Sequence, residues 1–217
     1  MFLKKITALF SLLLLTVPGQ AQVSAGISFN NGDLSSFYLA LGQTYNVPER
    51  EVIIIREREI PDDEIPVVFF IANRAHVRRD DVCDLRRSGK SWMDIVLFYD
   101  LDPSIFYIEL TGDPGPEYGR VYGHWKHPRN NWRSIRFEDD DIVKMVNLRF
   151  VSNHYHVKPE EVVRLRSEHG SFVKVVRTVE SPEYRSSQGG HDNSGNDRKD
   201  DNKGGKGKGK GKKGKGH

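Results

Sequence analysis

A repeated spacing of apolar residues constrains this chain more than any other feature. The spacing is anchored on Val47, Val77 and Val157, and another valine stands five residues after each anchor. Positions six, eight and eighteen are also apolar, and position nine is always arginine. Apolar residues at positions five, six and eight share one side of a helix, so each copy predicts a helix with one buried face. These five positions hold Val52, Ile53, Ile55, Arg56 and Ile65 in the first copy, Val82, Cys83, Leu85, Arg86 and Ile95 in the second, and Val162, Val163, Leu165, Arg166 and Val175 in the third.

Helix start and stop signals divide each copy into two helices. Gly89 and Gly170 fit the left-handed residue that ends a helix, and Ser91 with Asp94 fits a capping pair at the start of the next. A unit of this length cannot bury its apolar face alone, so the copies must pack on one another. The sequence therefore predicts an all-α fold of divergent helix-turn-helix repeats packed in one domain. Helices are expected at residues 34–45, 48–58, 62–75, 79–88, 91–99, 138–154, 159–168 and 171–179, with a further short helix that starts at Asp102 and Pro103 and runs through Ile108.

The two ends of the chain differ from this body. Residues 1–21 have the positive start, apolar run and small-x-small site of a signal peptide, which predicts an exported, periplasmic or secreted product. Residues 22–33 are expected to form an N-terminal arm, and repeats 1 and 2 to fill residues 34–110. Repeat 3 is expected at residues 138–180. No segment after the signal is apolar enough for a transmembrane anchor.

Residues 111–137 interrupt the repeats. Their prolines and glycines argue against a long helix, and their aromatic residues argue against disorder, so an ordered loop laid over the helices is expected. The loop interleaves rings with cations, a composition that suits stacking on bases or sugars and pairing with anions. The alternative is that the rings pin the loop to the core. The candidate binding residues are Tyr118, Arg120, Tyr122, Trp125, Lys126, Arg129, Trp132 and Arg133.

The C-terminal segment carries the basic charge of the chain. The formal net charge is +3, yet residues from Ser186 onward hold nine Lys or Arg against four Asp, so the body is acidic. Residues 181–217 are expected to be a disordered Lys/Gly-rich tail, because their end has no apolar residue to bury. Such a polycation attracts polyanions in a salt-dependent way. Its lysines are Lys203, Lys206, Lys208, Lys210, Lys212, Lys213 and Lys215.

The segment around Pro116, with its Pro-x-Tyr-Gly-x-x-Tyr-Gly-x-Trp-Lys pattern, resembles one in small exported bacterial helical-repeat proteins of no assigned function. There it similarly lies between V-x-x-x-x-V-x-x-L-R helical units, and the likeness would cover about residues 34–177. It implies a shared fold and no activity. The V-x-x-x-x-V spacing also resembles helix-turn-helix sequences, but the repeat helices begin with acidic residues, which DNA-reading helices avoid.

Other residue sets favour structure over chemistry. The three repeat arginines are expected to bind helix-end carbonyls or neighbouring carboxylates. Cys83, the only cysteine, occupies a core position of the repeat. The histidine pairs His124 with His127 and His154 with His156 do not have the spacing of a zinc site, so no metal and no cofactor are expected.

These features predict an exported, non-enzymatic binding or interaction protein whose tail engages an anionic surface or polymer. Another envelope protein is a further expected partner. An extracytoplasmic, non-specific nucleic-acid binder is the first alternative, because loop and tail both carry cations. A hydrolase of cell-envelope polymers is the second, but no paired carboxylates or His–carboxylate pair can be identified for it, and no catalytic residue is expected.

Overall fold

Three long helices, α1 (Gly32–Tyr45), α3 (Ile65–Ala75) and α7 (Asp139–Tyr155), run into short helices through the same turn. The computed structural model describes residues 32–189. In each turn the residue before the anchor valine has a left-handed backbone, which Asn and His tolerate better than most residues. These residues are Asn46, His76 and His156, with φ of 52°, 56° and 55°.

Backbone hydrogen bonds close this turn. The Val47 N–H donates to the Gly42 carbonyl at 2.8 Å, and the Val77 N–H donates to the Ala72 carbonyl at 3.1 Å. This bond is the long one of the Schellman motif, and it satisfies a carbonyl left free at the helix end. Glycine suits position 42, because any Cβ there would lie 2.9 Å from the Val47 carbonyl oxygen.

The same turn occurs a fourth time, without a full repeat after it. Asp100 has φ 52°, and the Leu101 N–H donates to the Val96 carbonyl at 3.0 Å. A short 3-10 helix, η2 (Pro103–Phe106), stands where the other copies have an α-helix. Sequence spacing did not indicate this degenerate copy, because its later apolar positions are missing.

The remaining elements follow the predicted order. Residues 32–189 contain helices and connections but no strand, which confirms the all-α prediction. The other elements are α2 (Glu49–Glu57), η1 (Asp62–Glu64), α4 (Arg79–Arg87), α5 (Trp92–Phe98), α6 (Gly115–Trp125), η3 (Arg129–Ser134), α8 (Pro159–His169), α9 (Phe172–Glu180) and α10 (Pro182–Gly189).

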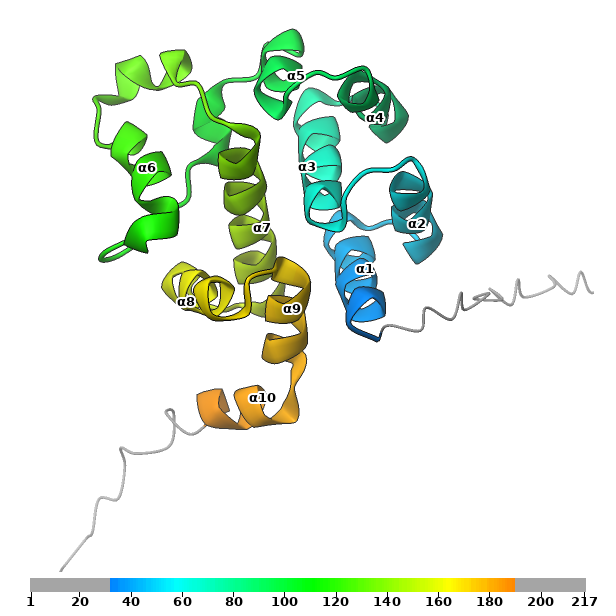
Figure 1. Cartoon of the computed structure of the whole chain (residues 1–217), viewed down its shortest axis with the longest axis vertical. Coiled ribbons are helices and arrows are strands. Elements are labelled where there is room, and N and C mark those ends of the chain that lie inside the picture. The colour runs from blue at the N-terminus through cyan, green and yellow to red at the C-terminus, as the bar shows by residue number, and fades with distance from the viewer. Residues whose placement is uncertain (1–31, 190–217) are drawn as a thin grey trace, which may run out of the picture.

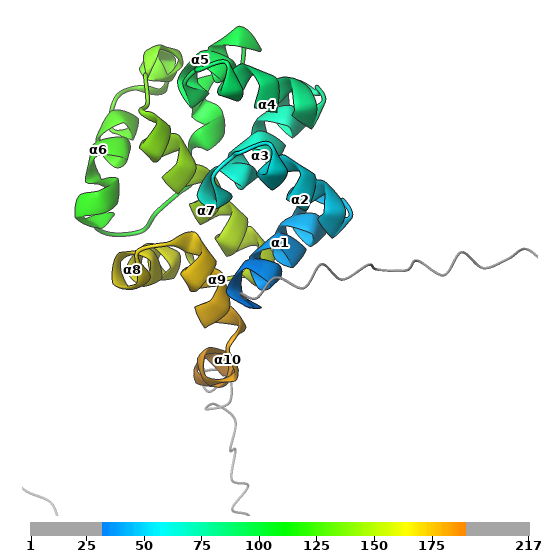
Figure 2. The same ribbon diagram turned by 45° about the vertical axis from the view of Figure 1, so that its right-hand side comes forward.

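The long helices lie inside and the short helices outside (Figure 1). α3 packs against α7 in the centre, whereas α2, α4 and α8 lie at the periphery. α3 ends the first unit and begins the second. The second unit ends in α5, which packs against α7, the first helix of the third unit. The third unit ends in α9, which packs against α1, so the described chain closes on itself (Figure 2).

The apolar stripes of the repeats meet in one core. All three valines five residues after the anchors are fully buried, as are the apolar residues eighteen positions after the anchors. These are Val52, Val82 and Val162, followed by Ile65, Ile95 and Val175, each with 0 % exposure. The repeat therefore predicted the core positions on which the fold depends.

One expected assignment and two expected boundaries were wrong. Residues 111–137 are ordered but are no loop, since they contain α6 and η3. Pro116 lies in the first turn of α6, where its missing N–H breaks no helical bond, and the glycines of α6 do not interrupt it. The tail was expected from residue 181, but α10 extends to Gly189, and α1 begins at Gly32 inside the expected arm. The expected signal peptide, most of the arm and the lysines of the tail lie outside the described residues.

Within residues 32–189, no helix combines the length and apolar character needed to cross a bilayer.

Candidate polyanion-binding surface

The large rings of residues 111–137 face the core. Tyr118 has no exposed surface, and Trp125 and Trp132 are each only 7 % exposed. The two indole rings meet with centroids 4.7 Å apart, and Trp125 also packs on Phe137 at 5.2 Å. Of the two readings left open by the sequence, the structure supports packing for these three rings.

The polar atom of one ring attaches the segment to the preceding residues, and that of another closes a bond within it. The Tyr122 hydroxyl donates to the Ile108 carbonyl at 2.8 Å, and burial raises the pKa of this phenol. The Trp132 indole N–H donates to the His127 carbonyl at 2.8 Å. These bonds give the polar atom of each ring a partner, as buried Tyr and Trp usually require.

Arg120 also forms contacts that stabilise the fold. Its guanidinium forms ion pairs with Glu138 and, at 2.7 Å, with Asp141. Asp141 is only 2 % exposed and caps the start of α7 by accepting a hydrogen bond from the Glu138 N–H. Arg120 therefore ties α6 to α7, and its charge is balanced by two carboxylates.

The other cations of this segment remain at the surface. From Val121 to Phe137 the chain contains four Lys or Arg residues and no acidic residue. All four are exposed, although the body as a whole is acidic. They form what we call the basic surface: Lys126, Arg129, Arg133 and Arg136. Arg136 was missed in the sequence, because its neighbours Ile135 and Phe137 are core residues.

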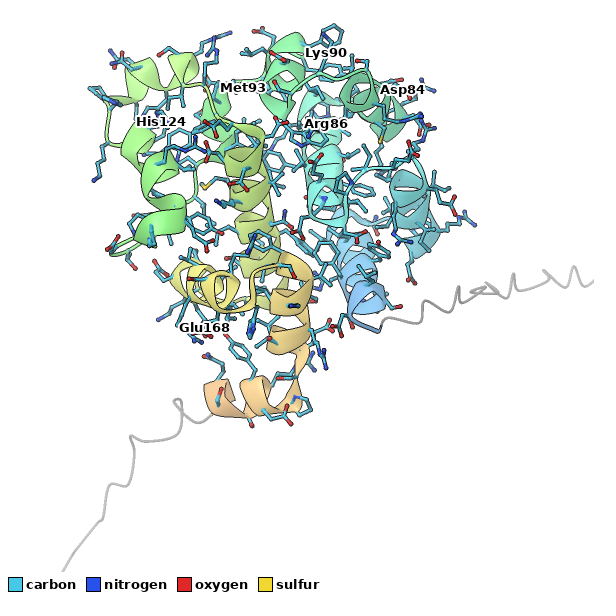
Figure 3. All side chains as sticks on the ribbon, in the orientation of Figure 1. Asp84, Arg86, Lys90, Met93, His124 and Glu168 are labelled. Atoms are coloured by element: carbon cyan, nitrogen blue, oxygen red, sulfur yellow. The ribbon has the colours of Figure 1, made fainter. Side chains whose placement is uncertain are left out.

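The arginines of the repeats interact with acidic side chains and take no part in the basic surface. The Arg86 guanidinium forms two 2.9 Å hydrogen bonds with the Glu64 carboxylate and contacts Asp139 at 2.5 Å. It also donates to the Lys90 carbonyl at 3.1 Å. In Figure 3, Arg86 lies on the inner side of α4, beside α3, whereas Asp84 lies on its outer side. The predicted structural role is confirmed for this residue.

The acidic triplet of η1 pairs with the arginines of the first two copies. Arg56 forms an ion pair with Asp62 at 3.4 Å, and Glu64 holds Arg86. The charge of Arg166 acts on Asp63, the residue between them. Burial raises the pKa of the Asp63 carboxyl, and Arg166 opposes that shift. Two of three consecutive carboxylates thus pair with arginines of two units, and the arginine charge of the third unit acts on the carboxylate between them.

The remaining candidates for chemistry have structural surroundings. Cys83 is fully buried, and burial raises the pKa of its thiol to about 11, so the thiolate nucleophile is suppressed at neutral pH. His156 supplies the left-handed turn, and His154 shares a hydrogen bond with Thr44 across 2.8 Å. Among residues 32–189 no group of three or more His, Cys, Asp or Glu side chains is placed to hold a metal ion.

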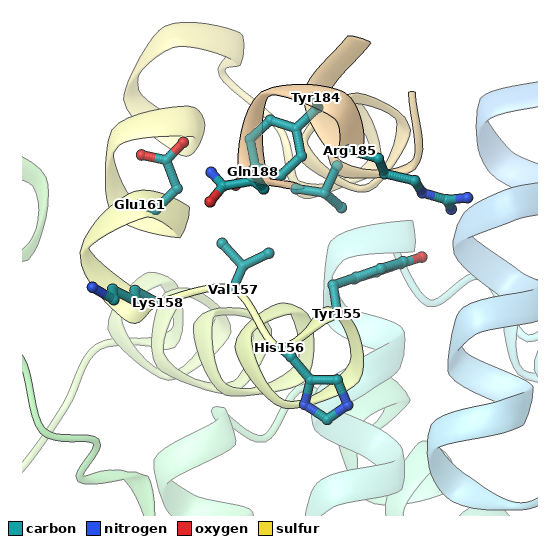
Figure 4. Close-up of a pocket in the computed structure, with 9 residues that line it drawn as sticks. Tyr155, His156, Val157, Lys158, Glu161, Tyr184, Arg185 and Gln188 are labelled. Carbon is teal, nitrogen blue, oxygen red and sulfur yellow. The ribbon is translucent and has the colours of Figure 1, made fainter. Parts of the chain in front are cut away.

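A groove of about 480 Å³ lies among α7, α8, α9 and α10 (Figure 4). Val157 points into its middle and Tyr184 covers it from α10, so its centre is apolar. The charged ends of Lys158 and Arg185 point away from that centre. The groove therefore offers little to an anion, and the basic surface is the better candidate.

Comparisons of this chain with models of protein families, with curated proteins and with solved structures found no match.

Proposed function

We propose that this chain is an exported, non-enzymatic protein that binds anionic polymers or surfaces. Its Lys-rich tail provides attraction at long range, and the basic surface, which runs from the end of α6 through η3 to Arg136, provides a second, ordered contact. The observation that carries the proposal is the separation of charge along the chain. Seven lysines gather in the tail with no acid among them, and four exposed cations follow one another between Val121 and Phe137 with no acid in that segment, although the body as a whole is acidic.

The two basic regions support the proposal in different ways. The tail has seven lysines between Lys203 and Lys215 with no acid among them, and each charge near a polyanion releases counterions. The basic surface is held on rigid elements, because Arg120 ties α6 to α7 and Trp125 packs against Trp132. A positive face on a net acidic body orients the protein toward a polyanion.

The test is salt-dependent retention of the full-length protein on a carboxylate resin. Replacing the seven tail lysines by glutamine should lower the salt concentration of elution and reduce the slope of log affinity against log salt. Replacing Lys126, Arg129, Arg133 and Arg136 by glutamine should lower it further. A matched variant with the seven lysines replaced by arginine keeps the charge and should elute like the wild type.

The proposal fails if the glutamine tail variant elutes with the wild type. A double-stranded DNA column run in parallel addresses the nucleic-acid alternative. If DNA retains the wild type at higher salt than every carboxylate or phosphate polymer tested, the alternative is the better description.

A further inference from the structure

A hollow of about 470 Å³ lies between η2 and η3, at the edge of the basic surface. Its floor is the partly exposed ring of Tyr107, which packs against the nearly buried ring of Trp132 with centroids 4.9 Å apart. Its volume lies within the roughly 300–1,000 Å³ of small-molecule sites. The hollow therefore combines an aromatic floor with the region of the surface that carries excess positive charge.

The floor is held in place from below. Arg149 on α7 donates to the backbone carbonyl of Tyr107 and, at 3.2 Å, to that of Ile105. Arg149 is partly buried, and burial lowers the pKa of its guanidinium. The Trp132 indole is fixed by its bond to the His127 carbonyl. A site with positions fixed before binding loses less entropy when a ligand arrives.

Two arginines stand at the rim. The Arg129 guanidinium lies over the Trp132 ring at 5.1 Å and has no ion-pair partner within the described part of the chain. Arg133 forms an ion pair at 2.9 Å with Asp100, whose side chain is 90 % exposed. Exposed pairs of this kind contribute little, so both guanidiniums can turn to an incoming carboxylate.

The other polar groups of the hollow select among anions. The Asn130 amide and the Ser104 hydroxyl can exchange hydrogen bonds with ligand hydroxyls. Asp102 also lines the hollow, where its carboxylate accepts a bond from the Ser104 N–H at 2.8 Å. This fixed negative charge opposes a doubly charged phosphate but still allows a singly charged, hydroxyl-rich ring.

We propose that this hollow binds one sugar-acid unit of an acidic polysaccharide. The ring of the sugar lies on the aromatic floor, its carboxylate meets Arg129 and Arg133, and its hydroxyls meet Asn130 and Asp102. The proposal rests on the proposed function and deepens it, since it assigns selectivity to the body and long-range attraction to the tail.

The experiment measures binding of trigalacturonate to the full-length protein by calorimetry. It is run at about 0.3 M salt, where screening weakens the tail. We expect saturable binding at one site per chain, and a loss of about tenfold in affinity for Arg129→Gln and for Asn130→Ala. Arg87→Gln removes another exposed arginine, on α4, without an ion pair among residues 32–189, and should bind like the wild type. A neutral galactose trimer should bind at least tenfold more weakly.

Two outcomes would overturn this site. One is trigalacturonate binding that both variants leave unchanged while their thermal unfolding matches the wild type. The other is a trinucleotide that binds as tightly as trigalacturonate and loses affinity with Arg129→Gln but not with Asn130→Ala, which indicates charge attraction alone. Asn130 is exposed, so its variant keeps the test valid if Arg129→Gln fails to fold. Retention on the carboxylate resin is scored separately, so loss of this site leaves the proposed function standing.

Discussion

At the scale of single residues, the acidic triplet of η1 matters most. Arg86 is mostly buried and binds Glu64 through two parallel hydrogen bonds. Removing one partner of such a pair leaves a carboxylate without compensation. We expect Arg86→Ala to lower the free energy of unfolding by about 2–4 kcal/mol, measured by urea denaturation. Its exposed neighbour is the control, since Arg87→Ala should change stability by no more than about 0.5 kcal/mol.

The raised pKa of Asp63 predicts that its contribution to the free energy of unfolding depends on pH with the opposite sign to that of most carboxylates. Burial raises the pKa of Asp63, so the folded protein keeps this proton to a higher pH than the unfolded chain. Stability from this group is complete below its unfolded pKa near 4 and falls as the pH rises through the folded value. The unfolding free energy of Asp63→Asn minus that of wild type should therefore increase from about pH 4 upward and then level off. A difference that decreases with pH would mean that the Arg166 charge outweighs burial.

At the scale of elements, α6 shows how packing overrides local preference. Gly119 and Gly123 weaken a helix in isolation, yet α6 forms because Tyr118, Val121 and Trp125 bury one face against α7 and η3. A Cβ built on either glycine meets nothing within 4 Å. We expect Gly119→Ala and Gly123→Ala each to raise the free energy of unfolding by about 0.5–1 kcal/mol.

The matched control is a glycine-to-alanine substitution at a position where the backbone has a positive φ. Gly170 ends α8 with φ 73°, where an alanine is strained whatever the space around it. Gly170→Ala should therefore destabilise the protein. Destabilisation by both α6 variants would show that the glycines of α6 serve something other than this helix, and stabilisation by Gly170→Ala would contradict the strain expected at its positive φ.

At the scale of the whole molecule, the contact between α1 and α9 converts a row of repeats into a closed unit. Open repeat arrays unfold from their ends, because each repeat contacts only its neighbours. Here α1 and α9 cover each other, and Arg177 forms an ion pair with Asp33 at 3.0 Å across this contact. We expect a single cooperative transition in urea, with circular dichroism and tryptophan fluorescence changing together.

A substitution in α1 tests this coupling at a distance. Phe37 is fully buried and packs edge-on against Phe150 of α7 at 5.7 Å. Phe37→Ala should cost about 3–5 kcal/mol and shift both signals equally, although the tryptophans lie in α5, α6 and η3. If the circular dichroism transition shifts and the tryptophan fluorescence transition does not, then α1 unfolds independently of the elements that hold the tryptophans.

The amino-acid sequence by itself determined the helices and the core stripe. The period of the valines, the capping pair at Ser91 and the acidic first turns act over a few residues, so they can be read without knowing the fold. The charge of the tail is likewise a property of the sequence alone. These features predicted the burial of Val52, Val82 and Val162, which the structure confirms.

Only the tertiary structure decided how distant segments meet. The partners of Arg56 and Arg86 stand together in η1, on either side of the carboxyl on which the charge of Arg166 acts, and no spacing rule connects those four segments. The rings of residues 111–137 turned inward and their cations outward because α6 packs against α7. The hollow between η2 and η3 exists because Arg149, more than forty residues from Tyr107 in sequence, holds its floor. Local signals describe which residues form helices, whereas a site requires the positions of residues that only packing brings together.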